Sequence, residues 1–196
     1  MSIPAPFDRY EGEVLPEWID ANDHMNLAYY IVLFDYATDA LFDAIGIGRQ
    51  YKDTNNKGTF AVETHNLYEN ELLVGERVRI STQVLAVDSK RLHLSHEMFR
   101  LASGERAATQ ELLYLHVDLA KRRAAPFPDD VRERAVAAAA AHAHLPRPDW
   151  IGRRDHPLSD VVGERDGPTF REVDMQVHQF LSRSSFPTRE PEHFMG

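Results

Sequence analysis

The chain has no cysteine among its 196 residues, and it has no hydrophobic run of the roughly 18 residues that a membrane-spanning helix needs. Without cysteine there is no disulfide, thiol nucleophile or cysteine-based zinc site, so any chemistry depends on carboxylates, histidines or hydroxyls. The opening stretch MSIPAPFDRY lacks the basic cluster and apolar run of a secretory signal. We therefore expect a cytoplasmic protein that does not enter the membrane.

An excess of positive charge is also absent. The net charge is −9, and residues 1–48 carry nine acids against one base, whereas residues 49–196 carry 22 acids against 21 bases. A nucleic-acid partner needs a basic surface, so nucleic acid is not an expected partner. A local basic patch still suffices for a ligand with a few phosphates.

The overall composition is that of a soluble globular protein, with 43% hydrophobic and 27% charged residues. A chain of this length is short for two cores, so we expect one domain with an extension. The predicted long helix and strands place the domain at 1–128, and the extension then covers 129–196. A weakly periodic, proline-containing stretch fills most of the extension, apart from a predicted short helix, FREVDMQVHQFL.

The pattern predicts one long helix before Gly46, which is a stop signal. Apolar residues recur at spacings of four, three, four and four, so they share one helical face: Tyr30, Phe34, Ala37, Leu41 and Ile45. Asp35, Asp39 and Asp43 form another face, which we expect to be solvated because like charges at this spacing repel.

Strands are predicted around this helix, and a second helix is predicted from Asp129. The predicted strands are 10–15 and, after a loop at 52–58, 59–69, 77–86, 91–101 and 107–118. Short polar connections join the last three, which predicts antiparallel neighbours. One long helix against an antiparallel sheet is an α+β arrangement.

The turn before the long helix concentrates polar side chains: Glu17, Trp18, Asp20, Asn22, Asp23, His24 and Asn26. A helix N-terminus offers unpaired amides that can hold an oxyanion, so a carboxylate just ahead of it can direct water at a polarised carbonyl. The alternative from spacing alone is that an Asp or Asn caps the helix and that His24 only bonds locally.

The stretch WIDANDHMNLAYY resembles the motif of hotdog thioesterases of the 4-hydroxybenzoyl-CoA thioesterase type. The residues that match are Asp20, His24, Met25, Asn26 and Tyr30, and Asp23 stands where that family usually has Gly. The similarity extends to about residue 128 and includes VETH, SKRLHL and LLYLHVD. It is strongest to the branch associated with carnitine breakdown, in which the thioesterase hydrolyses betainyl-CoA or is fused to carnitine dehydrogenase.

This resemblance implies a hotdog fold, in which an antiparallel sheet wraps around one central helix, here with a helical and irregular C-terminal extension. It implies hydrolysis of a short acyl-CoA by a homo-oligomer, a dimer or tetramer, because hotdog sites generally lie between subunits. Asp20 would act as base or nucleophile while a helix N-terminal amide polarises the carbonyl. His24 would orient water or Asp20, and Asn26 would bond substrate or shape the turn. No metal or cofactor is needed.

Glu63 is a second candidate catalytic carboxylate. In FAVETHNLY it alternates with Phe60, Val62 and Thr64, so we expect it on the strand face that carries His65 and Leu67. Pairing of the sheet with a second subunit would let Glu63 reach that subunit's Asp20 loop. The alternative is a solvated glutamate or one paired across strands.

Further residues are candidates for holding the substrate. The predicted substrate-binding set is Trp18, Asn22, Tyr29, Tyr30, Thr64 and Tyr68, whose aromatic members would bind a trimethylammonium by cation–π contact or else pack the core. Lys90 and Arg91, at a hairpin tip, are the predicted CoA-phosphate ligands, with Lys57 and 121–123 as alternatives.

The remaining histidines favour structural roles, because His93 and His96 differ in strand parity and cannot readily share a metal. Two other functions stay open at this point. One is a hotdog hydratase or dehydratase acting on an enoyl or hydroxyacyl thioester. The other is a non-catalytic acyl-CoA-binding subunit in which Asp23 blocks the productive turn.

Overall fold

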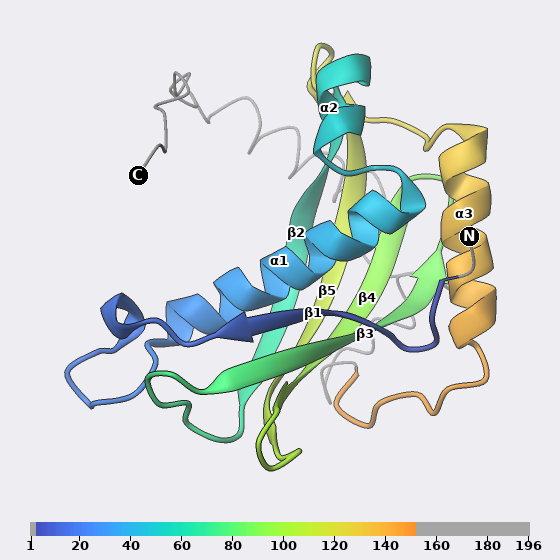
Figure 1. The fold of residues 1–196 in the computed structure, drawn as a ribbon. Helices are drawn as coiled ribbons and strands as arrows, with labels where there is room; N and C mark the ends of the chain where they lie inside the picture. The colour runs from blue at the N-terminus through green and yellow to red at the C-terminus, as the bar shows by residue number, and fades with distance from the viewer. Residues whose placement is uncertain (1–2, 152–196) are drawn as a thin grey trace, which may run out of the picture.

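The structure is a computed structural model in which residues 3–151 are described. In chain order the elements are β1 (Phe7–Glu13), the 3₁₀ turn η1 (Pro16–Trp18), α1 (Leu27–Ile45), α2 (Arg49–Asn55), β2 (Lys57–Tyr68), β3 (Arg77–Val87), β4 (Arg91–Arg100), β5 (Arg106–Asp118), β6 (Arg123–Ala124) and α3 (Asp129–His142). Figure 1 shows α1 lying across one face of a curled sheet. The predicted α+β hotdog arrangement is confirmed.

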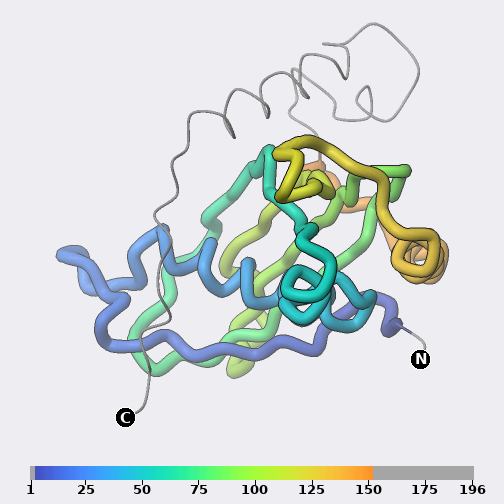
Figure 2. Tube along the Cα trace, turned by 90° about the horizontal axis from the view of Figure 1, so that it is seen from above, coloured from blue at the N-terminus to red at the C-terminus, as the bar shows by residue number. Residues whose placement is uncertain are grey.

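The sheet is antiparallel throughout, in the order β1-β3-β4-β5-β2, with β6 paired to β5. Among the described residues β1 and β2 are therefore its edges. Seen from above in Figure 2, α1 runs inside the curve of the sheet, and α3 stands at one side. The sheet leaves the whole outer edge of β2 without a strand partner in this part of the chain.

The apolar face of α1 is buried in two successive clusters along the helix. Its first half packs with Val14, Met25, Val78, Ile80 and Met98, and its second half packs with residues of β3, β4, β5 and α3. The predicted helical stripe from Tyr30 to Ile45 is buried at every position. Because each cluster joins residues far apart in sequence, the helix is fixed against the sheet along its whole length.

Capping determines where α1 begins and ends. The Asn26 side chain accepts a hydrogen bond from the Ala28 amide at 3.0 Å, so it is the N-cap. Gly46 takes a left-handed φ of 81° and donates its amide to carbonyls of the last turn, which is the conformation that glycine adopts most easily. The predicted stop at Gly46 is confirmed.

Two predicted segments differ from the structure in their type or bounds. The segment predicted as a loop at 52–58 is occupied mostly by α2, whose Tyr51 hydroxyl lies 2.8 Å from His116 Nε2 and fastens this weakly patterned helix to β5. The strand predicted at 10–15 lies instead at Phe7–Glu13, where it pairs with β3. In both cases partners distant in sequence decide the structure.

A register shift in β2 changes which side chains share a face. The pairing with β5 is irregular between Ala61 and Glu63, so Phe60 and Glu63, opposite Leu115 and Leu113, point to the same side. The predicted opposition of Phe60 and Glu63 is therefore wrong. Glu63, His65 and Leu67, expected on one face, do share it in the register.

The helix predicted from Asp129 is present as α3, and it packs on the same core as the sheet. Its buried Val131, Ala135 and Ala138 contact the cluster that contains Phe7 and Val84. Residues 152–196, including the predicted short helix at 170–181, lie outside the described residues. No helix within 3–151 is long and apolar enough to cross a membrane.

Candidate active site at the start of the long helix

The loop that carries Asp20 is closed by backbone hydrogen bonds. The Asp20 amide donates to the His24 carbonyl at 3.0 Å, and the Asn26 amide donates to the Trp18 carbonyl at 2.9 Å. Ile19 and Met25 form an isolated antiparallel bridge between them. The loop is thus a small hairpin that ends on the first turn of α1, and it presents Asp20 beside the helix N-terminus.

Asp20 and His24 lie close together in this loop and remain accessible. The Asp20 Oδ1 atom is 3.9 Å from His24 Nδ1, and their side chains are 23% and 33% exposed. The same Oδ1 accepts the Asn22 amide at 2.8 Å, which fixes the orientation of the carboxylate. A carboxylate held by one amide, with a histidine beside it and open to solvent, is placed to bind and activate a water molecule.

The N–H groups of an α-helix point toward its N-terminus, and those of the first turn of α1 have no intrahelical acceptor. Asn26 Oδ1 accepts the Ala28 amide, so this side chain caps the helix. The first helical amide, that of Leu27, has no carbonyl one turn behind it by position. Together with the positive end of the helix dipole, it can stabilise a developing oxyanion.

Asp23 occupies a left-handed backbone position, with φ 62°, and its amide donates to the Asp20 carbonyl at 3.1 Å. Glycine takes this conformation without strain, and aspartate is among the residues that tolerate it. The difference from the family's usual glycine therefore leaves the turn formed. This removes the structural reason for a turn blocked by Asp23.

We expect Asp23→Gly to change the free energy of unfolding by less than about 1 kcal/mol, because relief of the left-handed strain offsets the added entropy of the unfolded chain. Asp23→Val should cost at least about 1 to 2 kcal/mol, since a β-branched side chain opposes positive φ. Urea unfolding of both variants measures this. Equal stability of the two would contradict the backbone explanation.

Aromatic side chains near the start of α1 form two pairs. Trp18 and Tyr29 stack, with ring centroids 5.0 Å apart and planes 11° apart. Tyr30 and Tyr68 meet edge to face at 5.3 Å. Trp18 and Tyr29 are half-buried, Tyr68 is exposed and Tyr30 is buried. The Trp18 carbonyl accepts the Asn26 amide that closes the Asp20 loop, so the Trp18–Tyr29 pair borders this loop.

The other predicted substrate-binding residues lie at different places. Asn22 is exposed in the loop and contacts Asp20 through its backbone amide. Thr64 lies in β2 opposite Leu112, on the helix side of the sheet, and its Oγ1 is 3.4 Å from Asn66 Nδ2. The structure thus brings Asn22 to Asp20 and leaves Thr64 along the edge strand.

Glu63 points away from α1. Its cross-strand partner is Leu113, whereas the neighbouring Tyr114 faces α1 and packs against Phe42 with centroids 4.9 Å apart. Cross-strand partners share a face and successive residues alternate, so Glu63 lies on the face opposite the helix. Within one chain the structure does not bring Glu63 to the Asp20 loop.

The predicted CoA-binding residues lie at the other end of α1 from Asp20. Arg91 forms an ion pair with Asp88, which also accepts the Lys90 amide at 2.8 Å, so the hairpin tip is rigid. The Lys90 carbonyl accepts the His116 amide, next to the end where Lys57 pairs with Asp118. The 19 residues of α1 span about 27 Å between the two ends.

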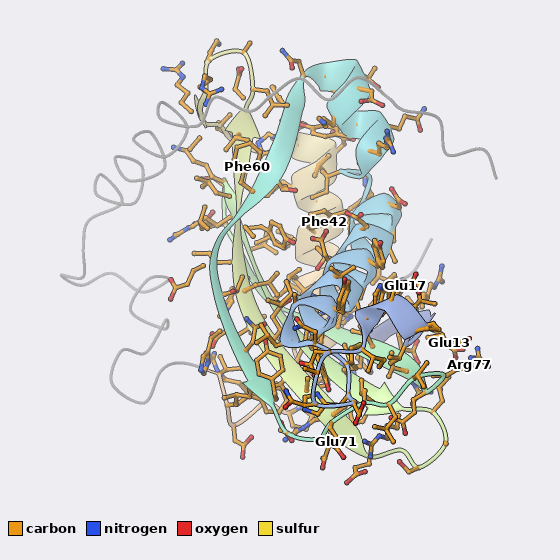
Figure 3. The ribbon with its side chains drawn as sticks, turned by 90° about the vertical axis from the view of Figure 1, so that its left-hand side faces the viewer. Glu13, Glu17, Phe42, Phe60, Glu71 and Arg77 are labelled. Atoms are coloured by element: carbon orange, nitrogen blue, oxygen red, sulfur yellow. The ribbon has the colours of Figure 1, made fainter. Side chains whose placement is uncertain are left out.

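The start of α1 is acidic. Figure 3 shows Glu13, Glu17 and Glu71 at this end of the molecule, with Arg77 beside Glu13. Along the exposed side of the helix, burial raises the pKa of Asp35, whose carboxylate lies 3.5 Å from the Tyr114 hydroxyl. Burial, and then the neighbouring carboxylates, raise the pKa of Asp39. Asp35, Asp39 and Asp43 are all exposed, so the predicted solvated acidic face is confirmed.

The core histidines each have structural partners. His96 is enclosed between Thr38 of α1 and Thr82 of β3 at 2.9 and 2.8 Å, and His93 Nε2 lies 2.9 Å from Glu111 Oε1. They point to opposite faces, as predicted. In residues 3–151 no three His, Asp or Glu side chains are arranged to hold a metal ion.

One part of the site has no signal in the sequence. The connection 69–76 between β2 and β3 lies beside the start of α1 (Figure 1), and its Leu72 carbonyl accepts the Met25 amide at 2.7 Å. Contacts of this kind use backbone atoms, which every residue type has. No residue pattern could therefore have identified this connection as a support of the Asp20 loop.

Comparison with known proteins gives consistent matches. A model of the thioesterase-like superfamily matches residues 14–135. Over 144 residues the chain is 43% identical to the betainyl-CoA thioesterase of Pseudomonas aeruginosa, covering 74% of this chain and 91% of that protein. It is 33% identical over 153 residues to the L-carnitine dehydrogenase/betainyl-CoA thioesterase of Rhizobium meliloti, spanning 78% of this chain and 31% of that longer protein.

A solved structure from Pseudomonas putida KT2440, described there as a proposed thioesterase, is 34% identical, with a TM-score of 0.66. The superposition covers 76% of this chain and 94% of that chain. The family match begins at Val14, in front of the Asp20 loop, and ends within α3, so it includes the helix start and the whole of β2 to β6.

Proposed function

The chain belongs to the thioesterase-like superfamily, and from this premise we propose that it hydrolyses betainyl-CoA to the free acid and CoA. It acts in the cytoplasm as a homo-oligomer and needs neither metal nor cofactor. The observation that carries the proposal is the position of the Asp20 carboxylate, accessible and fixed by the Asn22 amide, directly ahead of the α1 N-terminus.

The chemistry follows from this geometry. Asp20 takes a proton from water as the water oxygen attacks the thioester carbonyl, or attacks the carbonyl itself as nucleophile. The amide at the start of α1 stabilises the oxyanion, and His24 orients the water or Asp20. In the general-base route the C–S bond then breaks, and the CoA thiolate takes the proton that Asp20 received from water. In the nucleophilic route loss of the thiolate leaves a mixed anhydride on Asp20, and a water molecule hydrolyses it to the free acid and supplies the proton for the thiolate.

The surroundings of Asp20 suit a cationic acyl group. A trimethylammonium is attracted to aromatic faces, which Trp18 and Tyr29 supply beside the loop and Tyr68 supplies next to Tyr30 in the first turn of α1. The acidic side chains at this end add long-range attraction for a positive charge. The 43% identical relative is named for betainyl-CoA, which supports the same substrate.

The CoA phosphates need a basic partner, and at the Asp20 end Arg77 already pairs with Glu11, and Arg100 with Glu76 and Glu105. Lys90 lies at the other end of α1, where Lys57 and Lys121 both lie beside Asp118, and the helix between the two ends is about 27 Å long. Antiparallel pairing of two β2 edges about a two-fold axis would bring the basic end of one subunit toward the acidic end of the other. We therefore propose a dimer whose sites draw on both chains.

The test uses two thioesters of equal shape and different charge. Betainyl-CoA and its neutral carbon analogue, 3,3-dimethylbutanoyl-CoA, differ in the quaternary nitrogen alone. We expect kcat/KM, divided for each thioester by its rate of non-enzymatic hydrolysis to remove the inductive activation by the quaternary nitrogen, to be at least about 10-fold higher for betainyl-CoA, since cation–π and acidic groups together contribute more than about 1.4 kcal/mol. Free thiol release with a chromogenic reagent measures both rates.

The same assay separates the other functions. Equal rates for the two thioesters would refute the cationic substrate. Loss of an enoyl double bond without thiol release would identify a hydratase, and saturable binding with no reaction of any acyl-CoA would identify a binding subunit. Trp18→Ala should lower the preference for betainyl-CoA and leave the rate on the neutral analogue within about threefold.

A further inference from the structure

The hydroxyl of Tyr30 forms two hydrogen bonds inside the protein. Tyr30 is 4% exposed and lies in the first turn of α1. Its hydroxyl accepts the Leu72 amide at 3.0 Å and donates to the Asn70 carbonyl at 3.3 Å. Both partners belong to the connection between β2 and β3, about 40 residues away in the chain. A phenylalanine would fill the same space, so the hydroxyl itself needs an explanation.

That connection holds the Asp20 loop. The Leu72 carbonyl accepts the Met25 amide at 2.7 Å, and Met25 is fully buried directly after His24. The amide and carbonyl of Leu72 therefore link Tyr30 on one side to Met25 on the other. The link passes from the helix, through the connection, to the loop that presents the carboxylate.

The connection is held from the sheet side as well. The Asn70 side-chain amide donates to the Arg106 carbonyl at 2.8 Å, and the Asn70 backbone amide donates to Ala107. Arg100 bonds the Glu71 carbonyl and pairs with Glu76 at 3.3 Å. These hydrogen bonds hold segment 70–72 to β5 and β4 on the sheet side. On the α1 side the segment is held by its hydrogen bonds to the Tyr30 hydroxyl.

We propose that Tyr30 is a positioning residue: its hydroxyl fixes segment 70–72, which in turn fixes Met25 and the Asp20–His24 turn against the α1 N-terminus. This inference rests on the proposed function, since it assigns Tyr30 a part in the same site. It also replaces the substrate contact expected of Tyr30 from the sequence. Burial raises the pKa of Tyr30, so the hydroxyl keeps its proton and its donor role.

The kinetic test is Tyr30→Phe, which removes the hydroxyl and keeps the ring against Tyr68. We expect kcat for betainyl-CoA to fall about 10- to 100-fold and KM to stay within about threefold, because misplacement of a catalytic group by an ångström has this effect while binding is retained. Tyr36→Phe, on the exposed side of the same helix, is the matched control and should keep the wild-type kcat. Thermal unfolding confirms that both variants are folded at the assay temperature.

A second variant loosens segment 70–72 from the sheet side and leaves the residues of α1 unchanged. Asn70→Ala removes the bond to the Arg106 carbonyl and should give the same fall in kcat at unchanged KM. The double variant Tyr30→Phe/Asn70→Ala should be little worse than either single variant, because both act on one segment. A rise in KM at unchanged kcat would mean that Tyr30 touches the substrate, and wild-type kinetics would mean that the hydroxyl has no part in the site.

Amide hydrogen exchange tests the proposal without enzymatic activity. Tyr30→Phe should speed exchange of the Met25 amide at least about 10-fold, and should leave amides in the second half of α1 unchanged. Unchanged Met25 exchange would overturn the positioning role. If Met25 exchange rises but the wild type hydrolyses no acyl-CoA, the proposed function fails and the mechanical link stands.

Discussion

Asp20→Asn is expected to lower kcat for betainyl-CoA at least about 100-fold, with KM changed by less than about threefold. The asparagine keeps the shape of the side chain and can still accept the Asn22 amide, but it can neither take a proton from water nor attack the thioester. Steady-state thiol release, together with a thermal unfolding curve for each protein, measures the effect.

The neighbouring carboxylate provides a matched control. Asp23→Asn removes one negative charge from the same loop, and asparagine also tolerates the left-handed backbone found at this position. We expect its kcat to remain within about threefold of wild type. An equal loss in both variants would mean that the charge of the loop, and no single carboxylate, supports the reaction.

Glu63→Gln separates the two candidate carboxylates. Within one chain Glu63 faces away from α1, so only a second subunit can bring it to an Asp20 loop. A loss of 100-fold in Glu63→Gln with full activity in Asp20→Asn would overturn the assignment of Asp20. Large losses in both variants would instead support a site shared between subunits.

Acid is expected to destabilise the fold strongly through His96. This residue is fully buried beneath α1, stacked on Phe34, and burial lowers its pKa from 6.5 to about 3. Thr38 donates its hydroxyl to the Phe34 carbonyl, so it accepts from His96 Nε2, and Nδ1 accepts from Thr82. A second proton would leave Nδ1 unable to accept that bond.

The direction of the pH effect on stability follows from the protonation of His96 in the folded and in the unfolded chain. Above pH 6.5 His96 is neutral whether the chain is folded or not, and its contribution to stability is complete. As the pH falls from 6.5 toward 3, the unfolded chain binds a proton that the folded chain refuses, so the free energy of unfolding falls by an amount on the order of 4 kcal/mol. Burial also lowers the pKa of His116 and His142, which act in the same direction.

Urea unfolding between pH 7 and pH 4 tests this expectation. His96→Gln retains a donor and an acceptor for the two threonines but does not titrate, so its stability should fall with acid by about 3 kcal/mol less than that of the wild type. His144→Gln, at an exposed position after α3, should follow the wild-type curve. Parallel curves for wild type and His96→Gln would show that His96 does not control acid stability.

The regular part of the fold could be predicted from the sequence because its signals are local. The apolar period from Tyr30 to Ile45 sets the buried face of α1, and Gly46 ends it by a backbone preference of its own. The alternation in β3 and the short polar turns gave antiparallel strands. The motif from Asp20 to Tyr30 indicated the thioesterase family because its residue types and spacing are themselves the information.

Other features could not be predicted because they depend on contacts between distant segments. α2 is tied to β5 through Tyr51 and His116, and the irregular pairing after Ala61 turns Glu63 away from the helix. The Tyr30 hydroxyl meets residues about 40 positions away, by way of backbone atoms that carry no residue identity. The separation of Lys90 from Asp20 along α1 also follows from the topology alone.

The sequence by itself thus determined the fold class, the family resemblance and the loop in which the chemistry is expected, since periodicity, capping and motif spacing are properties of neighbouring residues. Only the tertiary structure decided which distant groups meet: Met25 with Leu72, Tyr30 with the 70–72 segment, and Glu63 with the opposite face of the sheet. The physical reason is that burial and hydrogen bonding join positions far apart in the chain, and those distances exist only once the sheet has curled around its helix.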